Sequence, residues 1–417
     1  MATLGQTVSS AEATEGLAFF IVILENDSLS RSLKQPFMQS LARRGSLFTD
    51  YHAITAPSQA NYWALTAGTT YGIRSNADIN LPGHSLFDLL DHASVSWKVY
   101  LENYPGQCFE GPYSTCVPSS PIGGLLGAGC ATGPWYARKH NPAISFDSIR
   151  QDPSRCARLV PATQLQADVL TGQVPQFAFY VPNQLNDGHD TDTRYTDDYL
   201  LQTWAPLLRD PAFVHNRVVI FTYDEDASGE NVPFEREAFG QRGRILTLML
   251  GPNVKSGQTL PTRYTHYDLL RTIEEYLSLG HLGQHDALPT TRRMEGWLQT
   301  GASSRTNGGG QQTQDFVQAM EGAVIEALAT TAATHRTPNI PATAGTGPTY
   351  QAIGELVAAG SAWSTVPFGE TQATQSGLAS RSSSSTPSRR WIWTLLAFVL
   401  IVGALIFLWW WFFKRGK

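Results

Sequence analysis

The chain has 417 residues, of which 42% are hydrophobic, so it can bury a large core and is not a disordered protein over most of its length. Its 30 basic and 35 acidic residues give a formal net charge of −5, which argues against broad nucleic-acid binding because that function needs a basic surface. Any anionic substrate must therefore be held by a local site.

The N-terminal residues 1–16 predict an extension and not a signal peptide. They contain no basic start, and the apolar run 17–24 that follows ends in Glu25, Asn26 and Asp27 instead of small residues. The run therefore predicts a β-strand.

Apolar, β-branched runs alternate with helical patterns over residues 17–300, which we expect to form one catalytic domain. This alternation predicts an α/β fold with a mostly parallel sheet covered by helices on both faces. Strands are expected at 17–24, 97–101, 177–181, 218–223 and 245–250. Helices are expected at 36–44, 85–93, 197–208 and 266–277, the last opened by a capping box from Thr265 to Asp268.

The segment TAPSQANYWALTAG at 55–68 predicts a proline turn that leads into a helix beginning near Ser58. Unpaired N–H groups and the positive dipole end of such a helix attract an anion such as a phosphoryl group. Asn61 would lie one turn further on, facing the same way. Serine is also a common N-cap, so this segment alone leaves Ser58 as either a nucleophile or a cap.

Polar clusters follow the first, third and fourth of the expected strands. Because ligands bind outside the carboxyl ends of parallel strands, we expect these clusters to share one edge. Their carboxylates, amides and imidazole suit a divalent cation. The clusters are Glu25-Asn26, then Asn183, Asn186, Asp187, His189 and Asp190, and finally Asp224-Glu225-Asp226.

The cysteines Cys108, Cys116, Cys130 and Cys156 match no CxxC zinc or redox spacing. Two disulfides that pin a long excursion and four reduced, buried thiols both fit these positions. The sequence does not decide between them, because the compartment sets the redox state.

The region 301–390 is rich in Ser, Thr, Gly, Ala and Pro and predicts a low-complexity tether. Within it, an amphipathic helix is expected over 312–330 and should dock onto the main domain. Its apolar stripe comprises Phe316, Val317, Met320, Val324, Ile325 and Leu328.

Residues 391–413 contain no charge and predict a transmembrane helix, since as a helix they would extend roughly 34 Å. Tryptophans at both ends suit the two membrane interfaces. We therefore expect a single-pass C-terminal tail anchor in the lipid bilayer. With no signal peptide, the globular part is expected in the cytosol, and a lumenal or extracellular face is the alternative.

Several short segments resemble the phosphoesterase family of bacterial and fungal acid phosphatases and phospholipases C. The resemblance covers about residues 17–290, looks closest to the fungal-type acid phosphatases, and implies an alkaline-phosphatase-like fold. The segments are ILEND at 23–27, APSQANY at 56–62, KHNP at 139–142, PNQLNDGHDTD at 182–192, FTYDED at 221–226 and THYDLLRTIEEYLSL at 265–279.

The resemblance implies a site made of residues from all these segments. Ser58 would be the nucleophile beside a divalent metal ion of unidentified element, while His140 and His189 would contact phosphoryl oxygens. Asn61 and His266 match further family positions near the site. The implied metal ligands are Glu25, Asn26, Ser58, Asp224 and Glu225. Gln59-Ala60 departs from the family pattern of a proline after Glu or Gln.

We therefore expect a membrane-anchored, metal-dependent phosphoric-ester hydrolase. An acid-phosphatase-like phosphomonoesterase acting through a phosphoserine fits best. A phospholipase C-like phosphodiesterase is the alternative within the family. A catalytically silent membrane scaffold on the same fold is the alternative of another class, and it predicts broken ligand positions, whereas the matched polar positions are all present.

Overall fold

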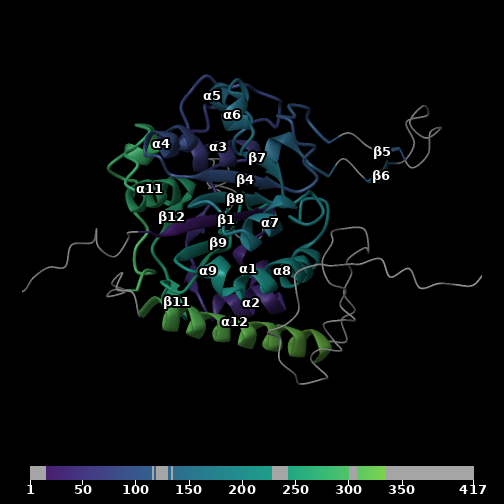
Figure 1. Cartoon of the computed structure of the whole chain (residues 1–417), viewed down its shortest axis with the longest axis vertical. Helices are drawn as coiled ribbons and strands as arrows, with labels where there is room; N and C mark the ends of the chain where they lie inside the picture. The colour runs from purple at the N-terminus through teal and green to yellow at the C-terminus, as the bar shows by residue number, and fades with distance from the viewer. Residues whose placement is uncertain are drawn as a thin grey trace, which may run out of the picture. The chain divides into compact units, whose positions relative to one another are not determined.

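The computed structural model describes residues 16–114, 117–118, 130–132, 135–227, 243–299 and 308–333. Its main sheet is 8-stranded, with the order β11-β2-β10-β9-β1-β8-β4-β7 (Figure 1). Neighbouring strands are parallel except where β10 pairs with β9 and with β2. The prediction of a mostly parallel sheet is thus confirmed. The strands are β1 (Ala18–Leu24), β2 (Ser46–Phe48), β4 (Trp97–Leu101), β7 (Leu159–Pro161), β8 (Phe177–Val181), β9 (Arg217–Tyr223), β10 (Thr247–Leu250) and β11 (Gln258–Leu260).

Helices and two small sheets surround this sheet. The small sheets pair β3 (Tyr51–His52) with β12 (Tyr264–Thr265), and β5 (Val117–Pro118) with β6 (Cys130–Thr132). The helices are α1 (Leu29–Ser32), α2 (Pro36–Ala42), α3 (Gln59–Ala67), α4 (Leu86–His92), α5 (Asp147–Arg150), α6 (Pro153–Cys156), α7 (Gln164–Leu170), α8 (Thr193–Leu208), α9 (Pro211–Val214), α11 (His266–Tyr276) and α12 (Gly308–Ala333), with 3₁₀ turns η1 (Arg138–His140) and η2 (His285–Ala287).

The side chains of β1 pack against helices on both faces of the sheet. The ring of Phe19 lies 6.2 Å from Tyr276 of α11. Phe20 points to the opposite face, where its ring lies 5.5 Å from Trp204 of α8 and 5.4 Å from Phe213 of α9. Every residue of β1 is buried, and a strand covered on both faces reads as one continuous apolar run.

The strands and helices predicted within residues 17–300 all exist; β4 and β8 have the predicted ends, and the ends of the others are shifted. Strand β10 begins at Thr247, two residues later than expected, and helix α8 begins at Thr193, four residues earlier. The early start of α8 has a clear cause, because the side chain of Asp192 caps the helix by accepting from the N–H of Tyr195. The capping box of Thr265 and Asp268 is confirmed.

Helix α12 packs along α2 and also contacts α8 and α9 (Figure 1). The helix predicted over 312–330 lies within the residue range of α12. Its buried residues include Phe316, Met320, Ala323, Val324 and Ala327. The expected place of Ile325 in the stripe is wrong: it is 59% exposed, because it lies about 100° around the axis from Val324. Glu326 pairs with Arg43 and Arg44 after α2.

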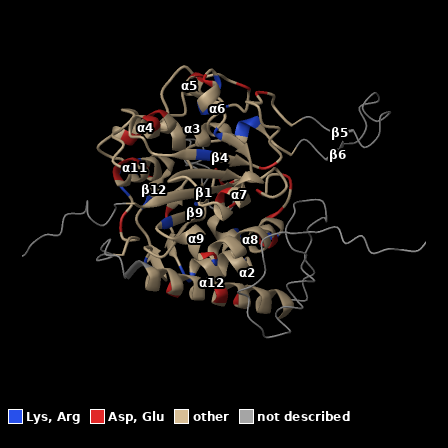
Figure 2. Cartoon of the chain, in the orientation of Figure 1, with Lys and Arg blue, Asp and Glu red and all other residues tan. Residues whose placement is uncertain are grey.

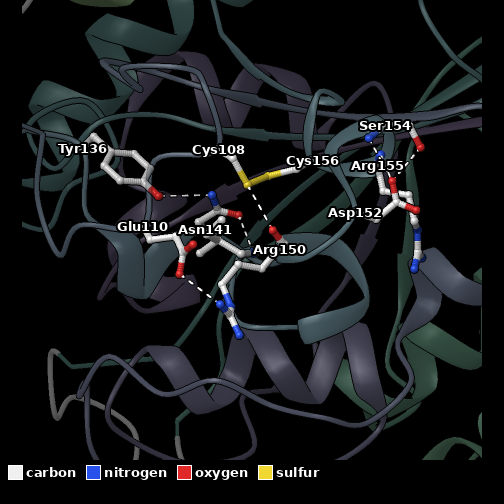
Figure 3. The surroundings of a disulfide bond; sticks show 10 residues. Cys108, Glu110, Tyr136, Asn141, Arg150, Asp152, Ser154, Arg155 and Cys156 are labelled. Atoms are coloured by element: carbon white, nitrogen blue, oxygen red, sulfur yellow. Dashed lines mark hydrogen bonds and ion pairs between the residues drawn. A yellow bond between two sulfur atoms is a disulfide. The ribbon is translucent and has the colours of Figure 1, made fainter.

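A disulfide joins Cys108 to Cys156 across 48 residues of sequence (Figure 3). Glu110 and Arg150 form an ion pair beside it, with 3.3 Å between Oε2 and Nη1. Two of the four cysteines are therefore oxidised to a disulfide and are not free thiols. Cys116 lies outside the described residues, so the second predicted disulfide stays a prediction.

The predicted tether, apart from α12, and the predicted transmembrane segment 391–413 lie outside the described residues, as does the extension up to residue 15. Among the residues that the structure describes, no helix is long and apolar enough to cross a bilayer. Acidic and basic residues are interspersed over the described helices and loops (Figure 2).

Candidate active site

The carboxyl ends of β1, β8 and β9 lie side by side, as their parallel pairing requires. Directly after β1, the N–H of Glu25 donates to the backbone oxygen of Asp187 at 2.9 Å. The N–H of Asn26 donates to Asp224 Oδ1 at 3.0 Å, and Asn26 has a φ of 66°, which asparagine tolerates better than most residues. The three predicted polar clusters therefore meet at one edge of the sheet.

Ser58 faces Glu25 and does not cap the helix that it precedes. It occupies the N-cap position of α3, yet its side chain makes no capping hydrogen bond. Its hydroxyl donates to Glu25 Oε2 at 3.0 Å, and the residue is 2% exposed. The sequence leaves Ser58 as either a nucleophile or a side-chain cap, and the structure excludes the side-chain cap.

Glu25 is the centre of a buried hydrogen-bonded group. The hydroxyl of Tyr62, on α3, donates to Glu25 Oε1 at 2.6 Å. His140, at the end of η1, lies between two carboxylates: its Nε2 is 3.3 Å from Glu25 Oε2 and its Nδ1 is 3.3 Å from Asp187 Oδ2. The rings of Tyr62 and His140 stack, with centroids 5.7 Å apart. Helix α3 and η1 thus bring distant parts of the sequence to one carboxylate.

The charges of this group stabilise one another. Burial alone raises the pKa of Glu25, but His140 and the Tyr62 hydroxyl lower it to about 2. Burial lowers the pKa of His140, while Glu25 and Asp187 raise it to about 9. Burial raises the pKa of Asp187 to about 7 against the effect of His140. At neutral pH, Glu25 and His140 are therefore a carboxylate and an imidazolium.

His189 is half-buried and lies next to this pair. Lys139 Nζ is 2.6 Å from its Nε2, and Asp190 Oδ1 is 2.7 Å from its Nδ1. Because an ammonium only donates, Nε2 accepts and Nδ1 carries the proton. One ligand atom each of Glu25, His140 and His189 lie within 4.8 Å of one another. Lys139 belongs to the KHNP motif, but the sequence analysis gives it no role.

His266 reaches the site through the backbone of Asp224. Its Nε2 lies 2.8 Å from the backbone oxygen of Asp224, and its Nδ1 lies 3.1 Å from the hydroxyl of Tyr51. Burial lowers the pKa of His266 to about 4, so the ring is neutral and donates from Nε2. His266 therefore positions the strand end and does not face Ser58.

Asn61 is also directed at the backbone. Its Oδ1 accepts from the N–H groups of Ile54 and Thr55, both at 3.0 Å, and its Nδ2 donates to the oxygen of Thr55 at 2.9 Å. These bonds fix the segment that leads into Ser58. Asn61 therefore has a positioning role, and its predicted orientation on the same side as Ser58 stays a prediction.

Glu102 is a residue at this edge that the sequence analysis missed. It follows β4 directly and accepts from the N–H of Asn183 at 3.0 Å, from Asn186 Nδ2 at 2.6 Å and from the Tyr180 hydroxyl at 2.9 Å. These bonds hold the loop after β8, which carries part of the site. A signal was present, because the rule that identifies polar residues after β1 and β9 applies equally to β4.

The carboxylates after β9 form a donor set that fits a divalent cation. Asp224 and Glu225 are buried. Asp224 Oδ1 accepts from Asn26, whereas Oδ2 has no hydrogen-bond partner within the described part of the chain. Burial, together with the charges of Glu25 and Glu225, raises the pKa of Asp224 well above its usual range. A cation here would relieve this crowding of like charges, and its preferred ligands are oxygens.

Comparison with known proteins gives matches over this same region. A sequence model of the Phosphoesterase family matches residues 28–280. A probable acid phosphatase from Kluyveromyces lactis is 30% identical over 288 residues, which cover 68% of this chain and 63% of that protein. An acid phosphatase from Aspergillus fumigatus is 29% identical over 289 residues, covering 67% of this chain and 60% of that protein. The match thus spans less than two thirds of either fungal protein.

Other similar proteins come from bacteria. A phosphatidylinositol-3-phosphatase from Mycobacterium tuberculosis is 26% identical over 284 residues, covering 66% of this chain and 81% of that protein. A solved structure from Vibrio parahaemolyticus, described as a protein in the alkaline phosphatase superfamily, is 14% identical with a TM-score of 0.42 and covers 69% of this chain and 75% of that chain.

Proposed function

Because the chain belongs to the Phosphoesterase family, we propose that it is a phosphoric-ester hydrolase in which Ser58 is the nucleophile. The observation that carries this proposal is the 3.0 Å hydrogen bond from the Ser58 hydroxyl to Glu25 Oε2. A buried serine directed at a carboxylate, with an imidazolium beside that carboxylate, is held for attack on phosphorus. Family membership also confirms the resemblance that the sequence motifs indicate.

A divalent cation is part of the proposal. Glu25, Asn26, Asp224 and Glu225 would hold it, with Ser58 as a further ligand. When bound, such a cation supplies positive charge for the phosphoryl oxygens and lowers the pKa of the serine hydroxyl. Oδ2 of buried Asp224 has no hydrogen-bond partner among the described residues, which supports this assignment.

The protein's own cations supply the rest of the binding charge. His140 is protonated at neutral pH, and the ammonium of Lys139 lies next to His189. In the first step, Ser58 passes its proton to Glu25 Oε2, its hydrogen-bond acceptor, as Oγ bonds to phosphorus. The bond from phosphorus to the ester oxygen breaks, and the imidazolium of His140 gives that oxygen a proton. In the second step, water attacks phosphorus and gives a proton to His140, the bond to Ser58 Oγ breaks, Oγ takes its proton back from Glu25, and phosphate is released.

The substrate class that we propose is a phosphomonoester. Fungal relatives of the chain are named acid phosphatases, and one bacterial relative is named a phosphatidylinositol-3-phosphatase. The uncharged stretch 391–413 supports a membrane anchor, which would place the site near lipid phosphomonoesters. A phospholipase C-like diesterase is the competing activity, and a silent scaffold is disfavoured because the site carboxylates and histidines are all in place.

The test is phosphate release from soluble monoesters, a phosphoinositide and a phosphodiester, with and without chelator. Ser58→Ala should lower turnover by at least about 10³-fold while metal content stays unchanged, whereas Asp224→Asn should lose metal and activity together. Acid-quenched wild-type protein should carry phosphate on Ser58. Near-normal turnover of Ser58→Ala, or phosphate on Thr55, would show that another residue is the nucleophile.

We further propose that the catalytic domain faces an oxidising compartment, in place of the cytosol expected from the sequence. The Cys108–Cys156 disulfide supports this, since structural disulfides persist mainly in secreted, lumenal or periplasmic proteins. Protease added to sealed vesicles should then leave the domain intact when the vesicle lumen is the oxidising side. Digestion under those conditions would show that the domain lies on the cytosolic face.

A further inference from the structure

A second group of metal-ligating side chains lies at the opposite end of α3 from Ser58. It consists of Glu274 on α11, His281 in the following loop and Asp286 in η2, and one ligand atom from each lies within 4.8 Å of the others. A Cβ built on Gly68, which ends α3, would come 2.5 Å from Asp286 Oδ1. The 9 residues of α3, a length of about 14 Å, therefore lie between Ser58 and Gly68.

Glu274 is the member of the group whose bonding is incomplete. Its side chain is 0% exposed, and its Oε2 lies 2.9 Å from His281 Nδ1. Its other oxygen, Oε1, has no hydrogen-bond partner among the described residues. Whether or not Glu274 is protonated, its bond with His281 uses only one of its two carboxyl oxygens. The other oxygen is a buried acceptor that this bond does not use. Native structures rarely leave such an atom without a proton, a water or a cation.

Asp286 presents a second, fixed carboxylate. It is fully buried, and it accepts from the N–H groups of Leu282 at 2.8 Å, Gly283 at 3.2 Å and Gln284 at 2.8 Å. Its charge contributes, after burial, to raising the pKa of Glu274 to about 9. Two buried carboxyl groups are thus held close together.

The neighbouring cation Arg271 is directed elsewhere. Its Nη1 donates to the backbone oxygens of Asp286 at 3.1 Å and Leu288 at 3.4 Å, and its Nε donates to the carboxylate of Glu275 at 2.8 Å. The guanidinium therefore moderates the local charge, but none of these hydrogen bonds goes to Oε1 of Glu274.

We propose that Glu274, His281 and Asp286 bind a divalent transition-metal cation, such as Zn²⁺ or Mn²⁺, at a structural site separate from the catalytic centre. Carboxylate oxygens combined with an imidazole nitrogen suit these ions, whereas Ca²⁺ and Mg²⁺ prefer oxygen alone. The side chain of His281 is 34% exposed, which gives the ion a route from solvent and leaves room for a water ligand.

The site would join the parts of the fold that carry the nucleophile. The N–H of His285, next to Asp286, donates to the backbone oxygen of Gly68 at 2.9 Å, so the loop is tied to the end of α3. Helix α11 contributes Glu274 and also begins with His266, which holds the backbone of Asp224. A cation between these elements fixes the α3–α11 pair against the loop.

The experiment uses the full-length protein in detergent, stripped with chelator and dialysed against Zn²⁺. Metal per chain is measured by mass spectrometry of the eluted protein, and thermal unfolding is measured with and without Zn²⁺. We expect His281→Ala and Glu274→Gln each to hold about one ion fewer than the wild type. We expect Zn²⁺ to raise the melting temperature of the wild type by roughly 5 °C more than that of either variant, in which only the catalytic centre can still bind the ion.

Two controls separate this site from the catalytic one and from surface binding. Asp224→Asn should lose the other ion but keep the Zn²⁺-dependent rise in melting temperature. His84→Ala, which removes a histidine side chain that is 86% exposed, should behave like the wild type. Equal Zn²⁺ content and an equal thermal shift in His281→Ala and the wild type would overturn the proposal. If His84→Ala lost as much bound Zn²⁺ as His281→Ala, the binding would be adventitious and the proposal would fail.

Discussion

The histidines of the active site have different roles because their partners differ. His140 lies between two carboxylates and is protonated at neutral pH. His189 accepts from an ammonium at Nε2, so its proton is on Nδ1. His266 lies between a hydroxyl and a backbone oxygen and is neutral. The sequence places all of them near the site, but only their neighbours assign one as an acid, one as an acceptor and one as a positioning residue.

The neutral His266 should make the fold less stable in acid. Burial lowers its pKa to about 4 in the folded protein, against an ordinary value of 6.5 for histidine. Between these values the unfolded chain binds a proton that the folded chain does not, so stability is fully present above the unfolded pKa and falls as the pH drops towards 4. The shift corresponds to about 3 kcal/mol. Urea unfolding of the wild type between about pH 7 and pH 4.5 measures the loss.

A variant isolates this effect from the other titrating groups. His266→Gln keeps an amide N–H for the oxygen of Asp224 but cannot titrate, so its stability should fall less steeply in the same interval. His215→Gln, which replaces an exposed histidine, is the matched control and should follow the wild type. Equal slopes for the wild type and His266→Gln would contradict the assignment.

Among the elements, helix α12 is held by apolar burial more than by its ion pairs. Met320 is 1% exposed, so Met320→Ala should weaken the docking of α12 by about 2–5 kcal/mol. The carboxylate of Glu326 is 35% exposed, and Glu326→Ala should cost at most about 1 kcal/mol. Hydrogen exchange of the α12 amides should therefore accelerate far more in the methionine variant. The reverse order would show that the arginine contacts dominate.

The Cys108–Cys156 disulfide should contribute strongly to stability because it closes a long loop. With a sequence separation of 48, the chain-entropy relation gives about 4 kcal/mol as its effect on the unfolded state. Replacing both cysteines by serine should lower the free energy of unfolding by roughly 2–4 kcal/mol. A reductant should destabilise the wild type to a similar extent and leave the double variant unchanged. A double variant as stable as the wild type would refute this.

The strand ends were the most predictable part of the site. An apolar run covered on both faces is easy to read, and the polar residue that follows it marks the sheet edge, as for Glu25 and Asp224. His140 was reached only through the family resemblance, because it stands in a short 3₁₀ turn that no periodicity reveals. The contacts of Asn61 and His266 could not be predicted, since they are made to backbone atoms whose positions depend on the finished fold.

The short strands and the direction of β10 could not be predicted, for a related reason. β2 and β11 have 3 residues each, too few for a period of two to show. The direction of β10 is set by its connection from β9 and not by its own composition, which is as apolar as that of a parallel strand. Local pattern therefore specifies that a strand exists, while its direction is a property of the chain path.

For the whole molecule, deleting residues 391–417 should give a soluble protein with unchanged turnover of small esters. The reason is that the proposed site residues all fall between Glu25 and His266, well before the uncharged stretch 391–413. Co-sedimentation with liposomes should show binding by the full chain and none by the truncated one. Loss of activity towards soluble esters after truncation would mean that the tail takes part in the catalytic domain.

The complete burial of α3 limits how this molecule could acquire new substrates. All 9 residues of the helix that follows Ser58 are inside the core, so any change of size there disturbs packing before it alters selectivity. The segments 103–113 and 189–192, which follow β4 and β8, contain exposed residues instead. Substitutions in these loops can therefore change the substrate selectivity without disturbing the core. A library of variants aimed at a new ester would randomise these loops and leave Ser58 and α3 unchanged.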